Sequence, residues 1–185
     1  MKVKKTEPCY FEAFQTKGEL IKVEISGPGK NKDSLVEHAI ALKKKAEKEQ
    51  SYSSIWCVFD RDSDPANPND KKNFNKALSL ARANQIKVAY SNDAFELWYI
   101  LHYSFHQAAW RRDRYKDKLT ELLGVKYEKN NRTMYAKLKD KQSAAITNSK
   151  KLLDSYGANH NPESDNPCTT VYRLVEFLND YLEDE

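Results

Sequence analysis

The segment Ile55–Asp64, IWCVFDRDSD, passes from an apolar run directly into acidic residues. Residues 54–59, SIWCVF, form a nearly continuous apolar run, which is typical of a strand covered on both faces. Asp60, Asp62 and Asp64 follow at alternate positions. A row of carboxylates at the end of a buried strand needs a physical explanation, because charged groups are costly next to a core.

The pattern on either side of this segment alternates between strands and helices. Strands are predicted at residues 21–26, 54–59 and 86–91, and helices at 7–17, 34–50, 71–84, 93–105, 111–123, 132–155 and 169–183. Helix starts are predicted at Thr6, as an N-cap, and at Ser34, where Glu37 completes a capping box. The alternation predicts an α/β fold, a parallel sheet flanked by helices, with a mainly α-helical C-terminal half. We expect one domain, in which residues 107–185 form a helical extension packed on a core of residues 1–106.

Composition indicates a folded protein. The 185 residues are 39% hydrophobic and 31% charged and include eleven Tyr, seven Phe and three Trp, which argues against disorder. No apolar run approaches the roughly 20 residues that span a bilayer, and the N-terminus lacks the apolar region of a secretory signal. Cys9, Cys57 and Cys168 lie far apart and suit a reducing compartment, so a cytoplasmic location without membrane contact is expected.

The position of the carboxylates suggests their chemistry. In open α/β sheets the working site lies at the carboxyl ends of the strands, which is where Asp60 falls. Neighbouring carboxylates raise each other's pKa, and a divalent cation such as Mg²⁺ or Mn²⁺ removes that cost and can activate water. A solvated acidic turn is the alternative for Asp60 and Asp62, and Asp64 is expected to cap the following loop. A calcium loop is excluded, because Pro65 and Lys71 stand where Gly and Glu are needed.

Basic residues gather in a second segment, WRRDRYKDK, at residues 110–118. Arg111, Arg112 and Arg114 are candidates to bind backbone phosphates while the neighbouring aromatic rings stack on bases. Lys129 is a further candidate phosphate contact. The alternatives are an exposed amphipathic helix and an exposed loop lysine, and the net charge of +4 only weakly indicates a polyanion partner.

Three stretches in the same order carry a family resemblance. KTEPCYFEAF (5–14), VFDRDSD…SNDAFELWYILHY (58–103) and NPCTTVYRLVEFL (166–178) together resemble the RloB family, small proteins found beside restriction and phage-defence loci. Asp93 stands where the family usually has proline. The resemblance implies a TOPRIM-like, Rossmann-type fold, Mg²⁺-dependent phosphodiester chemistry and an ATPase partner encoded alongside. Relatives in this TOPRIM group act in abortive infection, some by cutting tRNA.

The resemblance also assigns roles to residues. The D-x-D motif of the family falls on Asp60 and Asp62, which would hold the metal, with Glu7 as a second metal ligand. Glu7 equally suits the first turn of a helix, where negative charge is favoured. The earlier glutamate and glycine of the family's E-G-x-x-T-E motif would fall on Lys2 and Val3, and the strand before them is not found. Either the natural start lies upstream, or the protein has lost its first strand and an acid.

Two residues of the helix expected at 93–105 are further candidates. Glu96 lies among apolar residues and needs a partner, which is either structural or part of the site. His102 follows six residues later, about 240° around the helix, so it does not share a face with Glu96. His102 is retained as a candidate catalytic residue, with a structural role as the default.

The sequence leaves three functions open. The first is a metal-dependent nuclease-type effector of a phage-defence or abortive-infection system, acting on nucleic acid, with tRNA as one candidate substrate, and controlled by an ATPase. Catalysis is expected if the first motif is supplied upstream. The second is a non-catalytic or degenerate TOPRIM-like module that binds a partner protein or nucleic acid. The third is a structural subunit of a defence complex.

Overall fold

The computed structural model describes residues 6–14, 32–46, 52, 54–63 and 69–180. The strand expected at residues 21–26 lies outside these ranges, as do Lys2, Val3 and Asp64. Of the helices in the described ranges, none has the length and apolar character that a membrane-spanning segment requires.

A small mixed sheet forms the centre of the described structure. Its strands are β1 (Trp56–Asp60), β2 (Lys87–Asn92) and β3 (Cys168–Thr169), in the order β1-β2-β3. β1 and β2 run parallel, with Asp60 opposite Ser91, whereas β3 pairs antiparallel to β2. The two strands predicted at 54–59 and 86–91 are confirmed, shifted by one or two residues, and β3 was not predicted. The α/β fold class is therefore confirmed.

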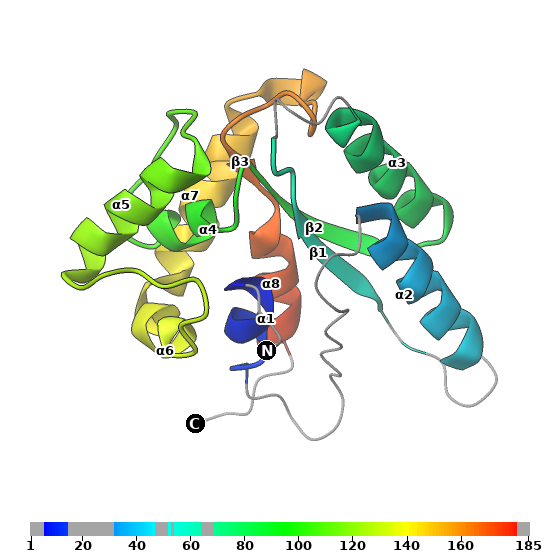
Figure 1. Cartoon of the computed structure of the whole chain (residues 1–185), viewed down its shortest axis with the longest axis horizontal. Coiled ribbons are helices and arrows are strands. Elements are labelled where there is room, and N and C mark those ends of the chain that lie inside the picture. The colour runs from blue at the N-terminus through cyan, green and yellow to red at the C-terminus, as the bar shows by residue number, and fades with distance from the viewer. Residues whose placement is uncertain (1–5, 15–31, 47–51, 53, 64–68, 181–185) are drawn as a thin grey trace.

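Helices surround this sheet. They are α1 (Thr6–Phe11), α2 (Lys32–Ala46), α3 (Asp70–Ala83), α4 (Glu96–Leu101), α5 (Arg112–Leu123), α6 (Met134–Leu138), α7 (Gln142–Asp154) and α8 (Val171–Asn179), with short 3₁₀ turns at Lys139–Lys141 and Gly157–Asn159. In Figure 1, α2 and α3 lie to one side of the sheet, and α4 to α7 gather on the other side. α8 packs against β2.

Several predicted helix bounds are wrong. The predicted capping box at Ser34 is not formed, because α2 begins at Lys32 and the Ser34 N–H bonds to Asp33 Oδ1 (3.0 Å). The single helix predicted at 132–155 is divided by the 3₁₀ turn at Lys139–Lys141. The helix predicted at 93–105 is restricted to α4, six residues long.

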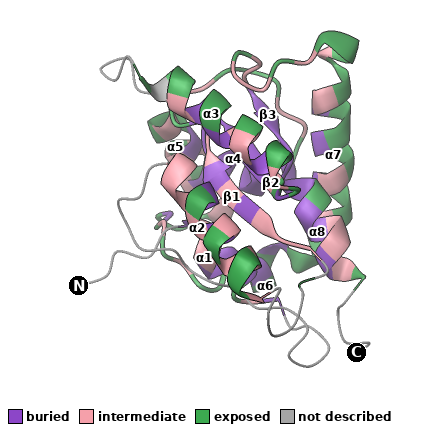
Figure 2. Cartoon of the chain, turned by 90° about the vertical axis from the view of Figure 1, so that its right-hand side faces the viewer, coloured by how far each residue is buried: buried purple, intermediate pink, exposed green. Residues whose placement is uncertain are grey.

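Both faces of the sheet are covered, as the apolar run predicts. Cys57 and Phe59 of β1 are buried in the cluster formed with α2 and α3, where Phe74 is also buried. Trp56 and Val58, which alternate with them, pack on the opposite cluster. Figure 2 shows the exposed outer faces of α2 and α3 in front of these strands. The chain reaches solvent just beyond the carboxyl end of β1, since Arg61 is still buried and Asp62 is exposed.

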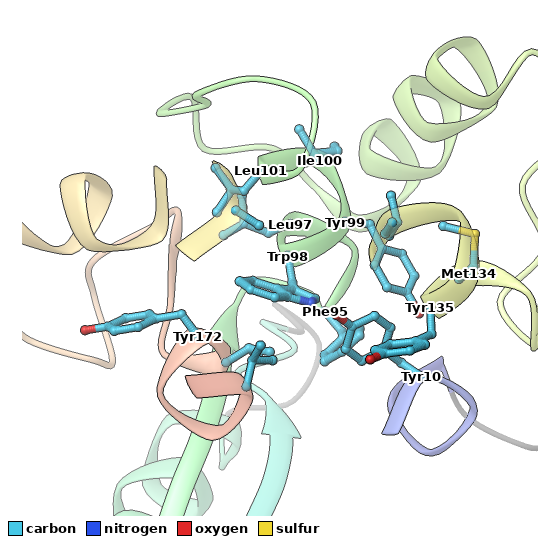
Figure 3. Close-up of a cluster of buried hydrophobic side chains, with 14 of the residues drawn as sticks. Tyr10, Phe95, Leu97, Trp98, Tyr99, Ile100, Leu101, Met134, Tyr135 and Tyr172 are labelled. Carbon is cyan, nitrogen blue, oxygen red and sulfur yellow. The ribbon is translucent and has the colours of Figure 1, made fainter. Parts of the chain in front are cut away.

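The second cluster joins the N-terminal helix to the helical half. Tyr10 of α1 is 1% exposed and lies against Phe95, Trp98 and Tyr99, around α4. Its ring also meets Tyr135 of α6 at a centroid distance of 5.5 Å. Figure 3 shows these rings converging between α1, α4 and α6. This packing fixes α1, and with it Glu7, relative to α4 and α6.

Candidate active site

The acidic turn after β1 is held by the segment that follows β2. The Arg61 N–H donates to the Ser91 carbonyl (2.7 Å), and the Asp62 N–H donates to the Asp93 carbonyl (3.1 Å). Asp62 has a φ of 53°, a left-handed conformation that aspartate tolerates better than most residues. These contacts hold Asp60 and Asp62 at the carboxyl end of β1, beside the carboxyl end of the parallel strand β2, which is where α/β sheets place their working sites.

One arginine bridges the two aspartates. Arg112, the first residue of α5, places Nη2 2.9 Å from Asp60 Oδ2 and Nη1 2.9 Å from Asp62 Oδ1. The side chain of Asp60 is 12% exposed and that of Asp62 is 56% exposed. The guanidinium therefore lies between one mostly buried and one solvent-exposed carboxylate.

Asp60 is surrounded by further negative charge. Its burial raises the pKa of the carboxyl well above its usual value, and Glu7 and Glu96 raise it further, whereas Arg112 lowers it. Its Oδ1 atom is buried and has no hydrogen-bond partner in the described part of the chain. α1 and α4 thus each contribute a carboxylate whose charge acts on Asp60, in addition to the larger effect of its burial.

Glu96 has the partners that its burial demands. The residue is 1% exposed, and its Oε1 accepts a hydrogen bond from the Tyr127 hydroxyl (3.2 Å). Lys129 Nζ lies 4.0 Å from the same oxygen, on a side chain that is 40% exposed. Tyr127 could not be predicted from the sequence, because the loop between α5 and α6 carries no periodic pattern that would show which residue turns inward.

The described hydrogen bond and ring contact of His102 involve Trp98 and none of these carboxylates. Its Nδ1–H donates to the Trp98 carbonyl (2.8 Å), and its ring packs edge-on against the Trp98 indole. Burial lowers the pKa of the imidazole to about 4, so the ring is neutral at physiological pH. Its described hydrogen bond and ring contact both point to a structural role.

The three arginines of the basic segment diverge. Arg112 turns to the aspartates, and Arg114 lies over the Trp110 ring with its guanidinium carbon 4.9 Å from the centroid. Arg111, at the N-cap of α5, is exposed. Lys129, for which an exposed loop lysine was the alternative to a phosphate contact, lies near Glu96. Positive side chains therefore flank the carboxylates from the helical half.

The donor chemistry of these carboxylates suits a hard divalent cation. Oxygen donors suit Mg²⁺ or Mn²⁺, and the unpartnered Asp60 Oδ1 is a free acceptor beside further carboxylates. Within the described ranges, no three acidic, histidine or cysteine residues are grouped closely enough to hold a metal. The guanidinium of Arg112 takes up the space between Asp60 and Asp62, so a metal shared by these two residues requires Arg112 to move.

Comparison with known proteins identifies one similarity. The family model described as RloB-like protein matches residues 3–178, nearly the whole chain. Searches of curated proteins and of solved structures returned no match. The match spans α1, the acidic turn and α8, and it includes each carboxylate described above.

Proposed function

This chain belongs to the RloB-like family, and on that premise we propose that it is a metal-dependent, phosphodiester-cleaving protein that acts on nucleic acid. It would serve as the effector of a phage-defence or abortive-infection system, with a TOPRIM-like fold and an ATPase partner encoded alongside. The observation that carries the proposal is the mostly buried carboxylate of Asp60, whose Oδ1 has no hydrogen-bond partner in the described part of the chain and whose pKa the charges of Glu7, Glu96 and Asp62 raise.

Each of these carboxylates, and each polar side chain beside them, has a part in this proposal. Asp60, Asp62 and Glu7 would hold Mg²⁺ or Mn²⁺, which when bound supplies an activated water and offsets charge on the phosphate. Tyr127 holds Glu96 in place through its hydroxyl. Lys129 and Arg112 lie beside the carboxylates and carry the positive charge that attracts a phosphate oxygen.

Cleavage assays with matched substitutions test the proposal. Radiolabelled tRNA and duplex DNA would be incubated with the wild-type chain and Mg²⁺ or Mn²⁺, alone and with the ATPase encoded beside it. We expect metal-dependent cleavage that Asp60→Asn reduces on the order of 100-fold or more. Asp154→Asn, at the exposed end of α7, is the control and should cut as the wild type does. Cleavage that survives Asp60→Asn would refute the proposal.

One observation favours a second function, a non-catalytic binding module. Arg112 already pairs with both aspartates, as a structural ion-pair network would. In that case the chain should bind RNA or a partner protein without cutting, and Asp60→Asn should leave the binding unchanged. Fluorescence anisotropy with labelled tRNA, measured beside the cleavage assay, separates the two functions.

A further inference from the structure

Arg112 contacts two carboxylates with two different nitrogens. Nη2 reaches Asp60 and Nη1 reaches Asp62, each at 2.9 Å. A guanidinium that bound one carboxylate in a fork would leave the other free. Here it lies between the two, where a shared cation would have to bind.

The two halves of this bridge differ in strength. Asp62 is 56% exposed, and ion pairs with exposed partners stabilise proteins little. Asp60 is 12% exposed, and removing the partner of a buried charge is strongly unfavourable. Arg112 can therefore leave Asp62 at little cost, but it leaves the Asp60 carboxylate only when another cation or a proton takes its place.

The side chain of Arg112 also carries an unsatisfied donor. Its Nε is buried and makes no hydrogen bond in the part of the chain that the structure describes, although the side chain as a whole is 29% exposed. A buried donor without an acceptor is unfavourable, and a turn toward solvent would relieve it. A guanidinium released from Asp60 would thus be able to turn toward solvent. There its planar fork suits a phosphate group, which it can bind with two hydrogen bonds.

From these contacts we propose that Arg112 is a built-in counter-cation that a divalent metal displaces. In the resting protein it occupies the position between Asp60 and Asp62, and the metal binds in exchange for it. The freed guanidinium then binds a phosphate of the nucleic acid, so metal and substrate together complete the site. This inference rests on the proposed function and specifies how that site is regulated.

Metal titration of charge-neutralised variants gives the first test. Mn²⁺ binding would be measured by calorimetry for the wild type, Arg112→Gln and the control Arg82→Gln, which lies exposed in the last turn of α3. We expect Arg112→Gln to bind Mn²⁺ about tenfold more tightly than the wild type. Arg82→Gln should match the wild type. Unchanged or weaker binding by Arg112→Gln, with its circular dichroism spectrum intact, would overturn the exchange.

The wild-type chain provides a second test that does not depend on folding of a variant. The guanidinium ¹H–¹⁵N resonances of Arg112 would be followed by NMR as Mg²⁺ is added. We expect them to move toward the averaged signals of a free arginine as the metal binds. Resonances that stay in place while calorimetry shows Mg²⁺ binding would overturn the exchange.

The two proposals fail in different ways. If neither the wild type nor Arg112→Gln binds Mn²⁺, the metal site itself is refuted, and the exchange with it. If both bind equally well and the Arg112 resonances do not move, only the exchange is refuted. Metal-dependent cleavage is then tested separately, by the cleavage assay with Asp60→Asn.

Discussion

Asp60 lies where burial and neighbouring carboxylates both favour its protonated form. The pKa of the carboxyl is raised well above its ordinary value of 3.8 by burial, by Glu7 and by Glu96, and Arg112 opposes this shift. An acid with a higher pKa in the folded chain binds its proton more tightly there than when unfolded. Its contribution to stability is therefore fully present only below the unfolded pKa, and it declines as the pH rises through the folded pKa.

Removal of this charge should stabilise the metal-free protein. Asp60→Asn keeps the size of the side chain and removes the unfavourable carboxylate, so we expect the free energy of unfolding at pH 7 to rise by about 1 kcal/mol. The melting temperature should increase by about 2–4 °C in the presence of a chelator. Differential scanning calorimetry would measure this increase. The control Asp154→Asn should leave the melting temperature unchanged. A lower melting temperature would show that the pair with Arg112 outweighs the repulsion.

His102 should make the stability depend on pH in the acid range. Burial lowers the pKa of its imidazole from 6.5 to about 4, so the unfolded chain binds a proton more readily than the folded chain. Stability should therefore fall as the pH decreases from 6.5 toward 4, by about 2 kcal/mol between pH 7 and pH 5. Urea unfolding at both pH values would measure this difference. His102→Phe, which keeps an aromatic ring against Trp98, should reduce it, and an equal difference in the variant would contradict the assignment.

At the scale of elements, β3 shows what periodicity cannot predict. A strand of two residues, Cys168–Thr169, is too short to alternate, and the segment around it had been predicted as the start of a helix. Its antiparallel pairing with β2 is extended by the next residue, Thr170, through one backbone and one side-chain hydrogen bond. The Tyr90 N–H donates to Thr170 Oγ1 (3.0 Å), and the Thr170 N–H donates to the Tyr90 carbonyl (2.8 Å). The order of elements alone does not reveal such contacts.

The hydroxyl of Thr170 should matter more than its size. Thr170→Val keeps the branched shape but leaves the buried Tyr90 N–H without its acceptor, which should cost about 1–3 kcal/mol. Urea unfolding monitored by circular dichroism would measure the loss. Thr147→Val, in the exposed part of α7, removes a hydroxyl that bonds only to the Ser143 carbonyl among its described contacts, and should change stability by less than about 0.5 kcal/mol. Equal effects of the two substitutions would refute the role of this hydroxyl.

The long apolar elements were predictable, and the side-chain pairings at the site were not. β1 and β2 were expected within two residues, because a continuous apolar run reports burial on both faces directly. The position of Asp60 at the end of β1 was predictable, whereas its electrostatic interaction with Glu7 and Glu96 depends on the packing of α1 and α4. The bridge from Arg112 could not be foreseen, since it depends on how α5 packs across the strand ends. Only the tertiary structure brings a residue 52 positions away to Asp60.

At the scale of the whole molecule, one apolar cluster includes residues of both halves. The cluster unites Tyr10, Phe11, Phe14, Ala89 and the buried apolar side chains of residues 94–101 with those of residues 115–152 and 171–178. Tyr10 makes ring contacts with Phe95 on one side and Tyr135 on the other, so α1 connects α4 to α6 (Figure 3). Such shared burial favours unfolding in one step, because neither half can lose its packing without exposing the other.

This connection predicts that the chain unfolds cooperatively and that Tyr10 stabilises both halves together. Trp56 on β1 can be followed by fluorescence after the other tryptophans are replaced by phenylalanine, while circular dichroism follows the helices. The two urea transitions should coincide in this reporter protein. Tyr10→Ala, made in the same protein, should lower stability by about 3–5 kcal/mol in both signals.

An exposed tyrosine provides the control for this experiment. Tyr52 is 46% exposed, so Tyr52→Ala should change the free energy of unfolding by no more than about 0.5 kcal/mol. If the two signals separate, or if Tyr10→Ala shifts only one of them, the halves unfold independently. The aromatic contacts of α1 would then be too weak to couple the two halves. The distance between Glu7 and Asp60, and with it the carboxylate site, would depend on how the two halves dock.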